Sequence, residues 1–253
     1  MTQSYRATAP FWKRGVISRL SDLIWPPRSL LSEEIVDRPG VIEPALWGEL
    51  KFLGAPWCAH CGFPLPQDIG EQAKCAACAA SAPAYDSARA ALVYDDHARR
   101  LILDLKRGGR RDGLPVFARW MASAGAAALE KADFLAPAPM HWTRLAARSF
   151  NQAAWLAQAL ARTVGKPWQP GALTRVKRRK SQAGLSASER RRNVGGAIKA
   201  SARFEGKTIV VVDDVFTTGA TLEACARALR KAGAAEVHAV TLARVVRPTD
   251  ILV

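Results

Sequence analysis

The hydrophobic pattern of the chain switches between strand-like and helix-like segments and predicts an α/β fold. Short apolar runs typical of strands lie at 90–94, 134–138, 209–212 and 237–244. Apolar residues at helical spacing lie at 98–105, 114–131 and 222–229. The run at 209–212 contains only β-branched residues, as expected for a strand buried on both faces of a parallel sheet. We therefore expect a parallel sheet flanked by helices.

Polar chemistry is concentrated directly after the strand at 209–212. Asp213 and Asp214 come first, and a loop rich in threonine follows: Thr217, Thr218, Gly219, Ala220 and Thr221. Ligands of open α/β sheets bind outside the carboxyl ends of the strands, where a helix that begins there offers free N–H groups. The loop suits a phosphate, and the aspartates suit sugar hydroxyls or a bridging Mg²⁺. Helix capping alone needs one such residue, so the pattern predicts a site for a phosphorylated sugar.

Four of the five cysteines form two Cys-x2-Cys pairs, Cys58 with Cys61 and Cys75 with Cys78. Each pair can present two thiolates on one turn, and two such turns complete a tetrahedral site with no open position. This spacing predicts one structural zinc ion. A disulfide is disfavoured in a cytosolic protein, and a redox role would need a single pair on a βα unit. Cys225 lies among alanines of the last helix and is expected to be buried.

Positive charge dominates the chain and narrows the choice of partners. The 253 residues carry 37 Lys and Arg against 22 Asp and Glu, a formal net charge of +15. Most of the excess lies in two segments, 99–111 and 177–192. Clustered basic charge favours polyanions such as a sugar diphosphate, nucleic acid or an anionic membrane over neutral partners.

Two further basic groups are candidates for holding phosphate. Arg144 and Arg148 are four residues apart, so a helix would place both guanidinium groups on one face, where they can clamp a diphosphate. Lys106 ends the helical pattern at 98–105 and opens a basic turn. For Lys106 a solvated charge cluster is an equally good interpretation.

The chain has no apolar run that approaches the roughly 20 residues needed to span a bilayer, and its beginning lacks the pattern of a cleaved signal peptide. We therefore expect a cytoplasmic protein with no integral membrane segment.

The segment from Ile209 to Thr221 resembles the binding signature for phosphoribosyl diphosphate (PRPP) of the type I phosphoribosyltransferases. With the two cysteine pairs, the chain is similar to the ComF family, the double-zinc-ribbon proteins with a phosphoribosyltransferase fold that are associated with DNA uptake in natural competence. Segments 139–152 (PMHWTRLAARSFNQ) and 180–194 (KSQAGLSASERRRNV) match further patterns of this family. The resemblance implies that Asp213 and Asp214 hold the ribose hydroxyls and that the loop 217–221 holds the 5′-phosphate. It also implies a flexible hood at 173–199 that carries Lys180 over the site.

The resemblance divides the chain into a zinc-ribbon module at 17–84 and a phosphoribosyltransferase-like domain at 85–253.

The sequence departs from the family pattern at the positions of a first cysteine quartet. Ser29 and Ser32 stand where a first cysteine pair is expected, and Glu43 and Leu46 stand where its partner pair would fall. Serine binds zinc poorly beside a thiolate, so this first ribbon is expected to be metal-free.

The favoured function is a PRPP-binding protein of DNA uptake and transformation. Catalysis is left open: a phosphoribosyltransferase would displace pyrophosphate from Mg²⁺-bound PRPP. One alternative is a non-catalytic adaptor that binds single-stranded DNA through the basic segment at 173–199. Another is a regulator that senses PRPP. DNA and the DNA-uptake machinery are the expected macromolecular partners.

Overall fold

The computed structural model describes residues 26–32, 34–68, 70–107, 110–140, 150–175 and 198–246. Three of the predicted site residues, Arg144, Arg148 and Lys180, lie outside the described residues, as does most of the basic segment at 173–199. The rest of the predicted site lies within them.

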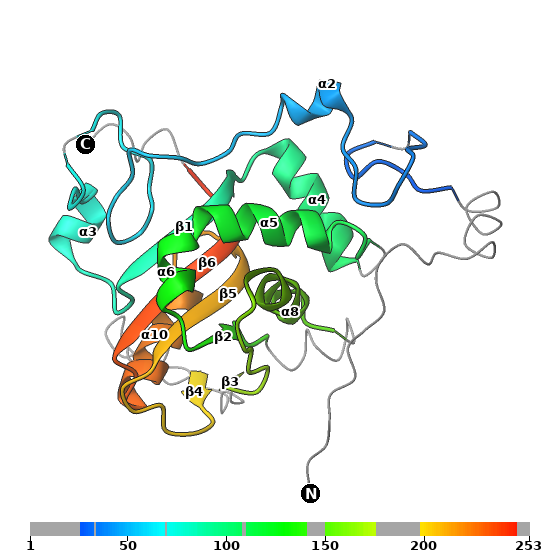
Figure 1. Cartoon of the computed structure of the whole chain (residues 1–253). Helices are drawn as coiled ribbons and strands as arrows, with labels where there is room; N and C mark the ends of the chain where they lie inside the picture. Colours follow the sequence, from blue (N-terminus) through cyan, green and yellow to red (C-terminus); the bar gives the residue numbers. More distant parts are fainter. Residues whose placement is uncertain are drawn as a thin grey trace, which may run out of the picture.

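A four-stranded sheet forms the centre of the fold (Figure 1). Its order is β1 (Ser87–Val93), β6 (Glu236–Arg244), β5 (Thr208–Phe216) and β2 (Phe134–Pro137), and all neighbouring strands are parallel. The parallel sheet that the apolar runs predict is confirmed. Its two central strands, β5 and β6, are mostly buried, which explains the apolar run at 209–212 and the many apolar residues of β6.

Strand β5 continues past the apolar run, which corrects the expected end at Val212. Asp213 pairs with Thr241, and Phe216 pairs with Arg244 at the end of β6. The strand extends because β6 offers backbone partners over its full length. The acidic pair therefore lies inside the strand rather than after it, and its backbone is fixed by the sheet.

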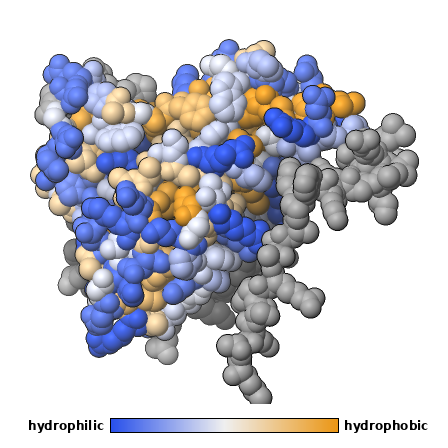
Figure 2. All heavy atoms as spheres, viewed as in Figure 1, coloured by the Kyte–Doolittle hydropathy of each residue, from blue (hydrophilic) through white to orange (hydrophobic). Residues whose placement is uncertain are grey.

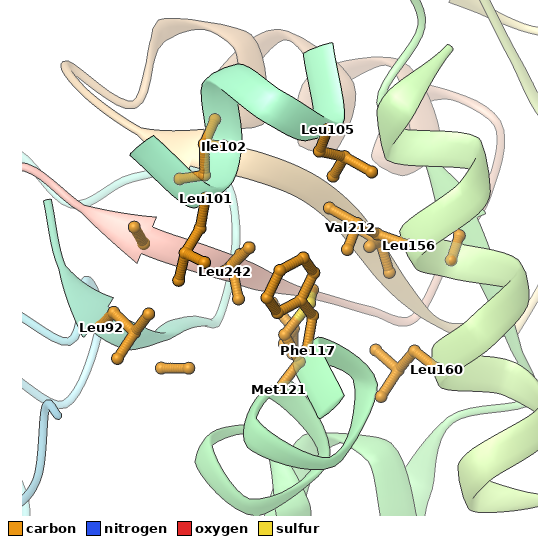
Figure 3. Close-up of a cluster of buried hydrophobic side chains, with 14 of the residues drawn as sticks. Leu92, Leu101, Ile102, Leu105, Phe117, Met121, Leu156, Leu160, Val212 and Leu242 are labelled. Carbon is orange, nitrogen blue, oxygen red and sulfur yellow. The ribbon is translucent and has the colours of Figure 1, made fainter. Parts of the chain in front are cut away.

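Four helices cover one face of the sheet, namely α4 (Asp96–Lys106), α5 (Leu114–Ala124), α6 (Ala126–Lys131) and α8 (Gln152–Val164). Their apolar side chains meet those of the strands in one cluster, with Phe117 and Met121 of α5 between Leu242 and Leu160 (Figure 3). Burying a side chain of this size contributes about 1.5–3 kcal/mol. This packing fixes α4 and α8 against β5.

The helical pattern at 114–131 is not one helix, which corrects the sequence expectation. It breaks at Gly125, which ends α5 and precedes α6. A Cβ atom at Gly125 would lie 2.5 Å from Val240 Cγ2. The backbone approaches β6 too closely there for a side chain, so the position requires glycine. Glycine disfavours the interior of a helix, and α5 ends at this residue although the apolar spacing continues.

The opposite face carries α10 (Ala220–Lys231), which packs on Ile209 and Val211 of β5. A two-stranded antiparallel sheet, β3 (Leu173–Arg175) with β4 (Ile198–Ala200), lies beside it. Cys225 of α10 is fully buried, as its alanine-rich surroundings predict.

The described residues of the N-terminal region at 26–84 form two short helices, α2 (Pro44–Trp47) and α3 (Ala76–Ala80). Its extended backbone at 51–53 bonds to the outer edge of β1, with Val93 N–H donating to Lys51 O and Leu53 N–H to Ala91 O. This contact covers a strand edge that would otherwise be exposed. Near it, Trp47 and Phe52 remain 46% and 44% exposed beside Trp120. Figure 2 shows hydrophobic residues along the upper part of this face, where Figure 1 places α2.

Candidate functional site

The second residue of the acidic pair in β5, Asp214, is held by two side chains from other elements. Asp214 is 6% exposed. Its Oδ2 atom accepts hydrogen bonds from Lys106 Nζ at 2.9 Å and from Gln152 Nε2 at 3.0 Å. Lys106 is the last residue of α4, and Gln152 is the first of α8. The helix packing described above therefore brings a cation and an amide to one carboxylate.

Asp213 has no cationic side chain bonded to it among the described residues, and its environment differs from that of Asp214. Burial, and secondly the neighbouring charge of Asp214, raise the pKa of Asp213 to about 8. At neutral pH the uncharged form of the Asp213 carboxyl is then favoured. A cation or a set of hydroxyl donors that approaches Asp213 would favour its ionised form.

The loop after β5 is shaped for an anion. Gly219 has φ +77° and caps α10, and a Cβ atom there would lie 2.8 Å from the ring of Phe216. Glycine is therefore required both by the backbone conformation and by the space. Thr217 and Thr218 are exposed, and within the described residues no partner accepts the N–H groups of residues 217–219. Free N–H groups before a helix, together with its dipole, are the features that bind phosphate.

One pocket of about 210 Å³ joins the acidic pair and the loop. Asn151 helps to form it by capping α8 and donating from Nδ2 to Ala138 O at 3.0 Å, which ties α8 to the end of β2. The pocket is lined by Lys106, Ala138, Pro139, Met140, Asn151, Gln152, Arg175, Asp213, Asp214, Val215, Thr217 and Thr221. Predicted residues from α4, β5 and the loop thus meet at one edge of the sheet. Thr218, Gly219 and Ala220 lie in the same loop but do not line this pocket.

The raised pKa of Asp213 gives a test without ligand. The unfolded carboxyl loses its proton near pH 4 and the folded one near pH 8, so Asp213 lowers stability as pH rises between these values. We expect Asp213→Asn to raise the thermal midpoint relative to wild type at pH 8.5 and to change it much less at pH 5. Differential scanning calorimetry at both values measures this. An equal shift at the two pH values would contradict the assignment.

The four paired cysteines form a second site. The Sγ atoms of Cys58, Cys61, Cys75 and Cys78 lie within 4.8 Å of one another, and Cys61 and Cys75 are 3.6 Å apart. Tetrahedral zinc with bonds of about 2.3 Å requires sulfur atoms about 3.8 Å apart. Three of the four residues are buried. The donor set and its spacing fit a closed metal site, as the sequence predicts.

The cysteine cluster rests on the sheet through one close backbone contact. Gly62 has φ +68°, and a Cβ atom there would lie 2.4 Å from Ala88 O of β1. Ala88 N–H in turn donates to His60 O at 2.6 Å. The first cysteine turn is thus packed directly against the edge of the sheet.

Arg244 connects the cysteine cluster with the 217–221 loop. It is 7% exposed, its guanidinium donates to Cys61 O, and it stacks on the rings of Phe63 and Phe216 at 5.2 and 4.3 Å. Phe216 directly precedes the loop. A cavity of about 600 Å³ opens here, lined by the cysteine turns on one side and by residues 216–220 on the other.

The positions of the expected first cysteine quartet also meet in space. The hydroxyls of Ser29 and Ser32 both donate to the carboxylate of Glu43. Burial acts to raise the pKa of Glu43. The bonds from Ser29 and Ser32, together with its other electrostatic contacts, act to lower it, and the net shift is downward. Leu46 packs against the main core. A hydrogen-bonded cluster of two hydroxyls and one carboxylate thus occupies the place of the missing thiolates.

Comparison with known proteins identifies the family. The Phosphoribosyl transferase domain family matches residues 150–250. Competence protein F of Haemophilus influenzae is 32% identical over 197 residues, which cover 75% of this chain and 85% of that protein. The chain belongs to the ComF family.

Two further ComF relatives are similar over much of the chain. DNA utilization protein YhgH of Salmonella typhimurium is 30% identical over 74% of this chain and 83% of that protein. Competence protein ComFC of Bacillus subtilis is 31% identical over 62% of this chain and 63% of that protein. With the parallel sheet and the matched domain, this ComF chain has the type I phosphoribosyltransferase fold, and its N-terminal region carries the four clustered cysteines.

Some site features were not predicted from the sequence. Gln152 enters the sequence prediction only as the last residue of the segment 139–152, and no local pattern indicates a role for Arg175 or Arg244. Lys106 was a candidate for phosphate, yet in the structure it pairs with Asp214. The one local signal for Gln152 was its place directly after Asn151, a good capping residue, at the start of an apolar helical pattern.

No helix among the described residues of this ComF chain combines the length and the apolar character needed to traverse a bilayer.

Proposed function

We propose that this ComF protein binds PRPP with Mg²⁺ in the pocket between the acidic pair and the 217–221 loop. The observation that carries the proposal is the convergence of Asp213, Asp214, Thr217 and Thr221 on one small pocket at the carboxyl edge of a parallel sheet. The loop would hold the 5′-phosphate through its N–H groups and hydroxyls. The aspartates would accept the ribose hydroxyls or orient the Mg²⁺ ion. Arg144, Arg148 and Lys180 remain proposed contacts of the diphosphate.

Where the protein turns PRPP over, the proposed reaction is displacement at C1 of the ribose. A nucleophile forms the new bond to C1, the bond from C1 to the diphosphate oxygen breaks, and pyrophosphate leaves with the electron pair. The protein contributes positioning of the sugar and stabilisation of charge on the leaving group. Mg²⁺, when bound, neutralises negative charge on the diphosphate.

The cysteine cluster supports a structural role for one zinc ion. Four sulfur ligands leave no open position, so the metal would hold residues 58–78 together rather than act on substrate.

We propose that the chain consists of a zinc-ribbon module at 17–84 and a phosphoribosyltransferase-like domain at 85–253. We also propose that the protein works in the cytoplasm.

The names of the relatives, competence protein and DNA utilization protein, support a role for this protein in the uptake or use of DNA. The net charge of +15 suits contact with single-stranded DNA and with the DNA-uptake machinery. The alternative functions are a non-catalytic DNA-binding adaptor and a PRPP-sensing regulator.

Isothermal titration with PRPP and Mg²⁺, followed by a pyrophosphate-release assay across candidate amines and bases, tests the proposal. We expect saturable binding of one PRPP per chain. Binding without pyrophosphate release would favour the sensor. If the protein does not bind PRPP but binds oligonucleotides with an affinity that falls steeply as salt rises, the result would favour the DNA-binding adaptor.

A further inference from the structure

Arg244 is a buried cation at the end of β6. It is 7% exposed, and the described residues place no carboxylate in an ion pair with it. The hydrogen-bond acceptors that they offer to its guanidinium are two atoms of one residue, the carbonyl oxygen of Cys61 and, 3.7 Å from Nη2, the Cys61 sulfur. Arg244 also stacks on the ring of Phe63, two residues further along the chain, at 5.2 Å. The cation is therefore held by the first cysteine turn.

A buried guanidinium requires a counter-charge, because moving an unpaired cation out of water is strongly unfavourable. Four thiolates around one Zn²⁺ ion carry a net negative charge. Cys61 would bring this charge to the guanidinium, since its sulfur is both a predicted zinc ligand and a hydrogen-bond acceptor of Arg244. The metal-loaded cluster would thus supply the counter-charge that no carboxylate among the described residues provides.

The same guanidinium contacts Phe216, the residue that precedes the 217–221 loop. Phe216 is the register partner of Arg244 across β5 and β6, and the centre of its ring lies 4.3 Å from the guanidinium carbon. The Phe216 ring also lies against Gly219, where a Cβ atom would be 2.8 Å from Phe216 Cε2. The ring of Tyr85 meets it nearly at a right angle, with the centroids 6.3 Å apart. The position of the Phe216 ring therefore limits how the backbone can turn at Gly219, where α10 begins.

We propose that Arg244 is a positioning residue through which the metal site holds the 217–221 loop in place. The contacts run from Cys61 through Arg244 and Phe216 to Gly219, each between adjacent groups. Loss of the metal frees the Cys61 turn, releases the guanidinium and loosens the ring on which the loop rests. The inference goes beyond the proposed function, because it concerns what holds the loop and not which ligand the loop binds.

Amide hydrogen exchange of the zinc-loaded protein, followed by NMR, tests this without any ligand. Two backbone bonds report on the loop: Glu223 N–H donates to Gly219 O at 2.8 Å, and Val245 N–H donates to Phe216 O at 2.9 Å. We expect zinc-loaded Arg244→Met to lose protection of these two amides by at least about tenfold, the effect of removing one hydrogen bond to a charged group. Unchanged protection of both amides overturns the inference.

Two controls separate a local effect from a general loss of stability. Leu135 N–H of β2 donates to Pro167 O at 2.9 Å, and its protection should not change in Arg244→Met. Arg203→Met removes a cation whose side chain is 84% exposed, and it should leave all three amides as in wild type. An equal fall at Leu135 and at the two reporting amides would show general destabilisation and overturn the inference.

Cys78→Ser tests the metal end of the same contacts. It should lower protection of the two reporting amides as Arg244→Met does, and the two changes together should add little, because both break one series of contacts. Additive falls overturn the inference. If Arg244→Met does not retain zinc, Arg244→Lys decides: it keeps a charge beside Cys61 but lacks the planar group that stacks on Phe216, so it should retain zinc and still lose protection about threefold.

Full wild-type protection in zinc-loaded Arg244→Lys, or its failure to retain zinc, would then overturn the inference. The exchange experiment contains no PRPP. A failure of PRPP binding would therefore contradict the proposed function and leave the link between the metal site and the loop standing.

Discussion

Replacing both aspartates, Asp213→Asn with Asp214→Asn, should abolish the thermal stabilisation of this ComF protein by PRPP and Mg²⁺. Amides keep the shape of the side chains but lose the negative charge that attracts Mg²⁺, and they bring N–H donors toward the sugar hydroxyls. At a ligand concentration of 100 times Kd, wild type gains about 2.7 kcal/mol, which raises the melting temperature by roughly 5–10 °C for a chain of this size. The double variant should show no shift in the same fluorimetric scan.

The two substitutions have opposite effects on the protein without ligand, so the comparison must be made against each protein's own baseline. Asp213→Asn removes a carboxyl whose pKa is raised to about 8, and this favours folding at alkaline pH. Asp214→Asn leaves Lys106 without the carboxylate it contacts at 2.9 Å, and this disfavours folding. A charge-matched control, Asp104→Asn with Glu130→Gln, changes neither the pocket nor the loop. A full ligand shift in the Asp213 and Asp214 double variant would place the ligand elsewhere.

Removing one cysteine, Cys78→Ser, should release the metal and unfold the cysteine turns. A purified wild-type chain should contain one zinc ion, and the variant close to none, by atomic absorption. Structural zinc contributes about 10–16 kcal/mol in small zinc domains, and this energy is folding energy because the site does not exist in the unfolded chain. The only helix that the described residues of this region contribute to is α3, which has five residues. Limited proteolysis should therefore cut this region in the variant and not in wild type.

Cys225→Ala is the matched control for the metal measurement. Cys225 is also buried and is the one cysteine outside the cluster, so its loss should leave the zinc content unchanged. Two zinc ions per wild-type chain would contradict the assignment of Ser29, Ser32 and Glu43 as a metal-free cluster. A wild-type chain with no zinc would contradict the metal site as a whole.

The local patterns of the sequence determined the main elements of this fold and the composition of both sites. The β-branched run at 209–212 indicated a buried parallel strand, and Asp213 with the 217–221 loop indicated where a ligand would bind. The spacing of the cysteines indicated that they would meet. These features were readable because strand burial, turn chemistry and metal ligation each depend on residues that are close in sequence.

Only the tertiary structure decided which side chains complete the sites. Gln152 and Asp214 are 62 residues apart, and Arg244 meets Cys61 across 183 residues. Such contacts depend on strand register and on the docking of α4 and α8, which no local pattern encodes. The break at Gly125 also depends on a tertiary contact. The backbone lies too close to Val240 of β6 for a side chain, and α5 ends at this glycine although the apolar spacing continues. The chain itself thus determined what chemistry is available, and the packing of the sheet and helices decided which of these groups face one another.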